Sequence, residues 1–300
     1  MKNQTKAYIL AIVAVAFWST IATTFNLSLK HISFTHLLLY ASLTSTLVAG
    51  VYLMSTGKLH KVFLAPPKQI LLAVFTGILN PYLYYLILLK AYKLLPAQEA
   101  GTLNYFWPVV LVLLSIPLLK QKITLLSFAS ILISFAGIVV ISTHGNPLAM
   151  KFSNGTGVAL ALICPFIWAL FWILNMKNPM EDASKLFLNF LTGFVLILIT
   201  VLLTDRISMP SIYGLIGSVY VGFFEMGITF LIWLKALKLS VTTARISNLV
   251  FLSPFISLIF IWLIIGEKIL PSTVAGLILI VSGIILQRYT NFSKVKKTIS

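Results

Sequence analysis

The residues best suited to chemistry lie inside long apolar runs, where each polar side chain requires a reason. The clearest stretch is 96–108, PAQEAGTLNYFWP, which carries Glu99, Asn104 and Trp107 and is followed by the apolar run VVLVLLSIPLL. A charged side chain facing lipid at mid-membrane costs roughly 2.5–3.5 kcal/mol on insertion scales. We therefore expect this helix to face an internal cavity and to present its carboxylate and amide to a polar ligand. For Glu99 the alternative is a cap at the start of the helix, where the macrodipole favours a carboxylate.

Two further ionisable residues lie in the second half of the chain. Glu225 is near the centre of the apolar run 211–234 and could carry a proton or hold a substrate amino group. The alternative for Glu225 is a neutral carboxylic acid that is hydrogen bonded to a backbone carbonyl. Arg245 begins the run 241–265, where the helix dipole disfavours a cation, so it should pair with a substrate carboxylate, Glu225 or a lipid phosphate. Asn248, one turn further in, could add hydrogen bonds to a polar ligand.

Three tryptophans, Trp18, Trp107 and Trp168, lie near the middle of their apolar runs. Tryptophan usually prefers the membrane interface, where its N–H group stays hydrated. At the midplane the N–H group needs a partner, and the ring offers a flat surface to an aromatic or cationic ligand. We expect the three rings to line the cavity; the alternative is packing between helices.

The third apolar run carries Asn80, Pro81, Tyr82, Tyr84 and Tyr85 near its middle. Proline inside a helix leaves one backbone carbonyl without its donor, and a neighbouring polar side chain can satisfy that carbonyl. These polar groups either stabilise a kink or line the path of the substrate. Asn80 aligns with Glu225 when the two halves of the chain are superimposed, which favours the substrate path.

The residues that we predict to bind substrate are Trp18, Asn80, Tyr82, Tyr85, Glu99, Asn104, Trp107, Trp168, Glu225, Arg245 and Asn248. The sequence contains no paired nucleophile and base and no phosphate-binding glycine loop, so we predict neither catalysis nor ATP-driven transport. The four histidines show no metal-ligand spacing. The single cysteine, Cys164, excludes an intramolecular disulfide and a CxxC metal site. We therefore predict no cofactor and no metal.

The composition restricts the chain to one class of protein. Of its 300 residues 59% are hydrophobic and only 9% are charged, which indicates a polytopic membrane protein. A formal charge of +16 would suggest nucleic-acid binding in a soluble protein. Here the basic residues lie between apolar runs, where lysine and arginine set the topology, so we expect no nucleic-acid partner.

Ten apolar runs are long enough to cross about 30 Å of hydrocarbon at 1.5 Å per residue. They are residues 7–29, 34–55, 68–89, 96–119, 123–142, 156–176, 185–204, 211–234, 241–265 and 270–289. With the N-terminus inside, fifteen of the 22 Lys and Arg residues fall on the cytoplasmic side and six outside, leaving Arg245 in the membrane. This excess predicts a multi-pass protein with both termini in the cytoplasm.

The two halves of the chain resemble each other. LLKAYKL at 88–94 matches WLKALKL at 233–239, and Pro108 matches Pro254. We predict two five-helix repeats, residues 1–146 and 147–300, forming a single membrane unit. Because five crossings is an odd number, the repeats must have opposite orientations, and inverted repeats are typical of alternating-access carriers.

These features resemble the EamA-type drug/metabolite transporters, with Gly266-Glu267-Lys268 closing the ninth span. WST (18–20), EAGTLNYFWP (99–108), KQK (120–122) and FIWA (166–169) resemble the bacterial aromatic-amino-acid exporters within that group. The resemblance implies an all-α bundle of ten transmembrane helices around a central cavity, acting as a monomer in the inner membrane. Glu225 and Arg245 depart from the pattern of the aromatic exporters.

We therefore expect a secondary transporter that exports small metabolites, in particular aromatic or neutral amino acids, by alternating access. Its expected partners are the lipid bilayer and a small zwitterionic or aromatic substrate. One alternative is a carrier of amines, nucleosides or sugars with the same fold. Outside this class, the alternatives are a lipid-modifying membrane enzyme and a passive channel.

Overall fold

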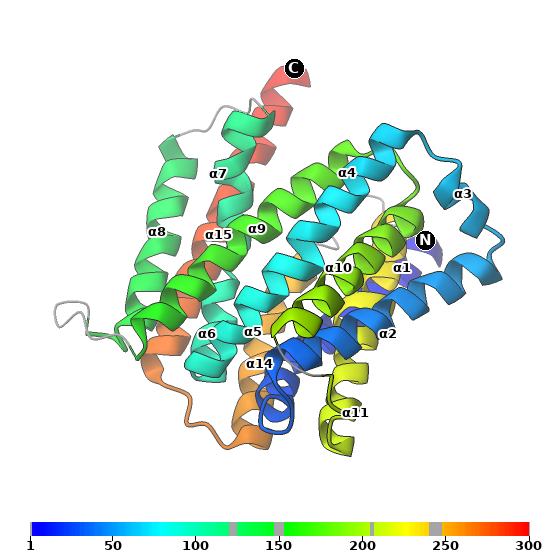
Figure 1. The fold of residues 1–300 in the computed structure, drawn as a ribbon. Coiled ribbons are helices and arrows are strands. Elements are labelled where there is room, and N and C mark those ends of the chain that lie inside the picture. Colours follow the sequence, from blue (N-terminus) through cyan, green and yellow to red (C-terminus); the bar gives the residue numbers. More distant parts are fainter. Residues whose placement is uncertain (1, 120–124, 147–152, 205–206, 240–247, 300) are drawn as a thin grey trace.

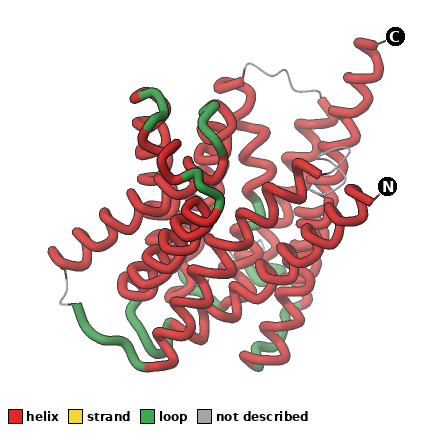
Figure 2. The backbone as a smooth tube through the Cα atoms, turned by 90° about the vertical axis from the view of Figure 1, so that its right-hand side faces the viewer, coloured by secondary structure: helices red, strands yellow, loops and turns green. Residues whose placement is uncertain are grey.

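The computed structural model describes residues 2–119, 125–146, 153–204, 207–239 and 248–299, and these form helices joined by short loops, without a strand among them (Figure 1, Figure 2). The α-helices are α1 (Lys2–Ser28), α2 (Phe34–Ser55), α3 (Leu59–Phe63), α4 (Pro67–Gly77), α5 (Tyr84–Leu94), α6 (Ala97–Asn104), α7 (Trp107–Leu119), α8 (Leu125–Ser142), α9 (Gly155–Lys177), α10 (Asp182–Thr204), α11 (Ile212–Val221), α12 (Ile228–Leu239), α14 (Ser253–Phe260) and α15 (Pro271–Ile299). Three π-helical turns (Ile78–Leu83, Gly222–Gly227 and Ile261–Ile265) and one 3₁₀ turn (Asn248–Leu252) join or extend them.

Six described helical segments are long and apolar enough to cross a membrane, judged by length and composition. They are Asn3–Ser28, Phe34–Ser55, Pro67–Leu94, Gly155–Asn175, Asp182–Thr204 and Ile212–Trp233. Shorter apolar helices cover Ile131–Ile141, Ser253–Ile265 and Pro271–Leu286. The run 96–119 is divided into α6 and α7, which explains why it does not count as one long helix. Large apolar side chains such as Leu47, Ile199 and Trp262 are exposed on the outside of the bundle, as expected for a surface that faces lipid.

Local sequence signals determine where several helices begin and end. The side chains of Ser33, Asn154 and Ser211 accept hydrogen bonds from backbone N–H groups three residues ahead and so cap α2, α9 and α11. Gly266 has a left-handed backbone conformation (φ 78°), which glycine adopts at little cost, and it ends the helix that began at Ser253. These caps satisfy groups that would otherwise be unpaired at the helix ends.

The helices of the two halves are interlocked. In the second half α10 packs against α2 and α4, α9 against α5 and α7, and α15 lies along α8 (Figure 1). In the first half α1 crosses α12 and α14. The centre of this arrangement contains fully buried aromatic side chains, among them Phe25, Tyr85, Phe171 and Phe230. Groups from both halves therefore meet in the middle of the bundle.

The third and eighth predicted runs both contain a π-helical turn. Ile78–Leu83 separates α4 from α5, and Gly222–Gly227 separates α11 from α12. In the first turn Asn80 has non-helical backbone angles (φ −147°, ψ 120°) next to Pro81. Such turns interrupt the regular hydrogen-bond ladder and change the direction in which following side chains point. The polar residues Asn80 and Glu225 lie within these two turns.

Lys185 on α10 stabilises the end of α9, which lies toward the upper end of the bundle in Figure 1. Its Nζ donates to the carbonyls of Asn175 (3.0 Å) and Asn178 (3.1 Å) and lies 3.1 Å from Asp182 Oδ1. A cation at a helix C-terminus complements the macrodipole and satisfies carbonyls that lack intrahelical donors. Lys185 therefore has a structural role at the junction of α9 and α10.

Two contacts join the halves at this same end. Lys58 Nζ lies 3.2 Å from Glu181 Oε1, and Asn178 Nδ2 donates to the carbonyl of Gln69 at 2.9 Å. Burial opposes the ionisation of Glu181, but hydrogen bonds from Ser184 and Lys58 hold its pKa below the ordinary value. Glu181 is therefore ionised at neutral pH and able to pair with Lys58.

The closest approach between α10 and the bend at Pro81 depends on Gly193. A Cβ atom at Gly193 would lie 2.6 Å from Pro81 Cδ, inside the contact distance. We expect Gly193→Ala to destabilise the protein by about 1–3 kcal/mol, the usual cost of overpacking a core. The measurement is thermal unfolding of the purified protein in detergent, with Gly155→Ala as the control because nothing lies within 4 Å of its Cβ position. Equal stability of the two variants would contradict this packing.

Candidate functional site

The centre of the bundle contains a carboxylate that is shared between the halves. Glu225, in the π-turn between α11 and α12, is 9% exposed, and its Oε1 accepts a hydrogen bond of 2.9 Å from the hydroxyl of Tyr85 on α5. The indole Nε1 of Trp18 donates to the backbone carbonyl of Glu225 at 3.4 Å. A carboxylate is thus held at the point where α1, α5 and the π-turn meet.

A second polar pair adjoins the first. Asn104 is the last residue of α6, and its Nδ2 donates to the hydroxyl of Tyr84 at 2.8 Å. The rings of Tyr84 and Tyr85 are 4.8 Å apart and nearly perpendicular, and the ring of Trp168 lies 4.7 Å from that of Tyr84. The Asn104 Oδ1 atom is buried and has no hydrogen-bond partner among the described residues. The two pairs therefore lie side by side in one buried polar and aromatic group.

Further rings complete this aromatic cluster. Trp172 stacks on Phe230 at 5.9 Å, and Phe230 also contacts Trp168 (6.0 Å) and Trp18 (6.3 Å). Tyr84, Trp172 and Phe230 were not among the predicted site residues. The available signal was that Tyr84 is next to Tyr85 in sequence, and that Phe230 follows Glu225 by little more than one helical turn. We call Trp18, Tyr84, Tyr85, Asn104, Trp168, Trp172, Glu225 and Phe230 the central cluster.

The structure brings five of the predicted site residues together and places three others nearby or elsewhere. The five are Trp18, Tyr85, Asn104, Trp168 and Glu225. Asn80 is buried at the bend, and its Nδ2 has no partner within the described chain. Tyr82 points toward α10, where its hydroxyl bonds that of Thr200 at 2.8 Å. Trp107, the first residue of α7, is half-buried against the core.

Arg245 lies outside the described residues, and so does the side chain of Asn248, whose backbone begins the 3₁₀ turn. Their predicted roles remain predictions.

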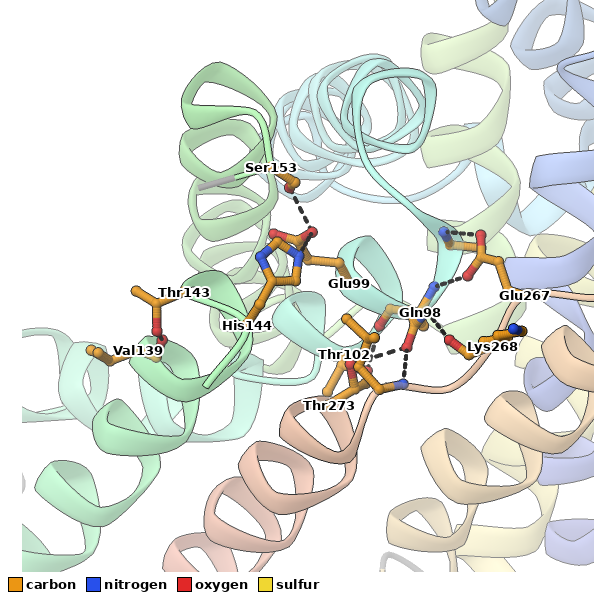
Figure 3. Close-up of polar contacts among 12 residues, drawn as sticks. Gln98, Glu99, Thr102, Val139, Thr143, His144, Ser153, Glu267, Lys268 and Thr273 are labelled. Atoms are coloured by element: carbon orange, nitrogen blue, oxygen red, sulfur yellow. Dashed lines mark hydrogen bonds and ion pairs between the residues drawn. The ribbon is translucent and has the colours of Figure 1, made fainter. Parts of the chain in front are cut away.

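Glu99 is the one predicted site residue still to be placed. It lies away from the central cluster, in the first turn of α6. Its Oε2 accepts a hydrogen bond from Ser153 Oγ (2.6 Å) and lies 3.7 Å from His144 Nε2, as Figure 3 shows. Its Oε1 is buried and has no partner within the described parts of the chain. Glu99 does not cap α6: the carboxylate of Glu267 accepts from the backbone N–H groups at the start of that helix instead. The alternative that the Glu99 side chain caps α6 by a hydrogen bond does not hold, because its carboxylate turns toward Ser153 and the end of α8.

Glu267 belongs to a dense set of hydrogen bonds that joins the halves at the lower end (Figure 3). Its carboxylate oxygens accept from Ala97 N (3.0 Å) and Gln98 N (3.3 Å). Gln98 Nε2 donates to the carbonyl of Lys268, and Gln98 Oε1 accepts from Leu270 N and Thr273 Oγ1 at 3.0–3.1 Å. We call Gln98, Glu267, Lys268, Leu270 and Thr273 the Gln98 cluster. Its hydrogen bonds connect the start of α6 to the loop before α15 and to the first turn of α15.

Comparisons with known proteins identify relatives of this architecture. The profile of the EamA-like transporter family matches residues 5–143 and 155–289. The uncharacterized transporter YvbV of Bacillus subtilis is 26% identical over 292 residues, covering 94% of this chain and 92% of YvbV. An uncharacterized transporter of Clostridium kluyveri is 28% identical over 60% of this chain, which spans 58% of that relative's length. The aromatic amino acid exporter YddG of Ancylobacter novellus is 24% identical over 176 residues, covering 58% of this chain and 60% of YddG.

A solved crystal structure has the same fold, with a TM-score of 0.67, 19% identity and coverage of 94% of this chain and 96% of that one. The family match extends over most of the chain and agrees with the helical bundle and with its apolar surface. The chain is a multi-pass membrane protein and belongs to the EamA-like transporter family.

Proposed function

We propose that this protein is a secondary carrier that exports aromatic or neutral amino acids across the bacterial inner membrane by alternating access. The observation that carries the proposal is the central cluster, where a buried carboxylate and aromatic rings from both halves converge. Ionisable groups at membrane depth generally mark a transport pathway. Carriers built from repeats bind substrate near the midplane at the interface of the repeats.

We further propose that the bundle consists of ten spans in two inverted repeats, 1–146 and 147–300, with both termini in the cytoplasm. Two matched stretches of one family, 5–143 and 155–289, support the duplication. The π-turns at Ile78–Leu83 and Gly222–Gly227 fall at equivalent positions of the repeats. That the protein acts as a monomer remains a prediction.

Alternation requires that the halves separate at one end while they stay joined at the other. At the lower end the Gln98 cluster joins them, and at the upper end Lys58–Glu181 and Asn178–Gln69 do so. We propose that the lower end faces outside and opens when the Gln98 cluster separates. Substrate would then leave the central cluster between α6 and the loop before α15.

The aromatic rings support an aromatic or apolar substrate body. Trp168 and Tyr84 present adjoining ring surfaces, and such surfaces bind rings by offset or edge contacts. The exporter of Ancylobacter novellus, whose name states aromatic amino acids, supports the same class. Amines are the second candidate class of substrate. Glu225 favours them because its carboxylate can pair with an ammonium group whether or not the substrate also carries a carboxylate.

A thermal-shift screen of the purified protein tests the proposal. A ligand that binds only the folded state stabilises it by about 2.7 kcal/mol at a concentration of 100 Kd. We expect aromatic or neutral amino acids to raise the unfolding temperature to a saturating value, and we expect Trp168→Ala to lose this rise while remaining folded. A rise with nucleosides or sugars and none with amino acids or amines would contradict the proposed substrate.

A further inference from the structure

We propose that the central cluster recognises the ammonium group of its substrate, through Glu225 and Asn104, and that binding does not require the substrate carboxylate. This inference rests on the proposed function and adds which end of the zwitterion is recognised. It predicts that the matching amine is a ligand and that the matching carboxylic acid is not.

The first step concerns charge. Glu225 is the one ionisable acid in the central cluster, and its described partners are the neutral groups of Tyr85 and Trp18. No lysine or arginine within the described chain forms an ion pair with it. A buried carboxylate without a countercharge is costly, so a ligand that supplies the positive charge gains the most from this position.

The second step concerns hydrogen bonds. Tyr85 donates to Oε1 of Glu225, and among the described residues nothing donates to Oε2. Asn104 uses its Nδ2 to donate to Tyr84, which leaves its buried Oδ1 as an acceptor without a donor. An ammonium group carries three donors and no acceptor, whereas a carboxylate carries acceptors alone. An ammonium group can therefore donate to these acceptors, whereas a carboxylate can donate to neither.

The third step concerns the position of these acceptors. The side chain of Glu225 is hydrogen bonded to Tyr85, and that of Asn104 is hydrogen bonded to Tyr84. The ring centroids of these two tyrosines are 4.8 Å apart. Trp168 covers Tyr84 at 4.7 Å. Ring faces attract a cation within about 6 Å of the ring centre, so this wall adds to the preference for a positively charged group. The remaining rings of the cluster, including Phe230, pack directly beside this wall.

Matched ligands separate the ammonium group from the carboxylate. One series consists of phenylalanine, phenethylamine, N-acetylphenylalanine and 3-phenylpropionate; a second consists of leucine, 3-methylbutylamine, N-acetylleucine and 4-methylpentanoate. The measurement is the half-saturating concentration for the rise in unfolding temperature of the purified wild-type protein. In the series whose amino acid binds, we expect the amine within about tenfold of the amino acid. The acid and the N-acetyl compound should be at least about 100-fold weaker, because they leave the acceptors unpaired.

Variants assign this preference to the named residues. Asn104→Asp keeps an acceptor and should keep the preference for the amine over the acid, whereas Asn104→Leu should reduce it. Glu225→Gln should reduce it further. Circular dichroism and the unfolding temperature without ligand show whether each variant is folded, and the ligand series on the wild type does not depend on the variants.

The possible outcomes separate this inference from the proposed function. Binding of the amino acid and the acid without binding of the amine would overturn the ammonium assignment and leave an amino-acid carrier. Equal binding of the N-acetyl compound would overturn it as well. If neither amino acid binds, the proposed function fails, and the inference fails with it.

Discussion

Glu225→Ala is expected to reduce transport by about 30-fold or more in reconstituted vesicles, while the protein still inserts and folds. Removing one member of a buried, hydrogen-bonded charge pair costs about 2–5 kcal/mol, and here the second member is the substrate. The same change leaves the Tyr85 hydroxyl without its acceptor. Tyr85→Phe removes only that hydrogen bond to a charged group, worth about 1.5–3 kcal/mol, and should reduce transport by a smaller factor.

The chain offers a matched control for this comparison. Tyr82 also carries a partly buried hydrogen bond, but its hydroxyl pairs with Thr200 on α10 and not with the central cluster. We expect Tyr82→Phe to retain transport and Tyr85→Phe to reduce it. The measurement is the initial rate of labelled amino-acid flux, normalised to the amount of folded protein in the vesicles. Transport by Glu225→Ala at the wild-type rate would show that Glu225 is not required for transport.

Much of the central cluster could be predicted because buried polar groups in apolar runs are rare and costly. Glu225, Asn104 and Trp168 stood out for this reason, and the structure brings them within one set of contacts. Tyr84 belongs to the polar group noted on the third run, but it was left out of the residues predicted to bind substrate; a regular helix separates the directions of two adjacent side chains by about 100°. In the structure α5 contacts α6, α9 and the first two helices, so both tyrosines are buried against partners.

Other positions could not be predicted because they depend on the bends and on contacts distant in sequence. Tyr82 follows the non-helical Asn80, and the bend directs its side chain to α10. Glu99 is at the position expected of a cap, but Glu267 takes that role from a loop about 170 residues away in sequence. Single-sequence patterns do not contain the rotation of a helix after a π-turn or the approach of a distant loop.

The most direct measurement of the alternating-access mechanism uses the Gln98 cluster. Gln98 and Thr273 belong to different halves, and their side chains are 3.0 Å apart at the lower end. In the variant Gln98→Cys with Thr273→Cys, a short and cleavable bifunctional thiol reagent can join the two halves at this point. The native Cys164 is buried, so it is protected from the reagent. Each single-cysteine variant treated with the same reagent is the control.

If the halves must separate at the lower end to release substrate, the joined protein should lose nearly all flux and recover it when the reagent is cleaved. The single-cysteine controls should transport at the same rate before and after treatment. Undiminished flux through protein that is fully joined at residues 98 and 273 would show that this end does not open, and would contradict the mechanism.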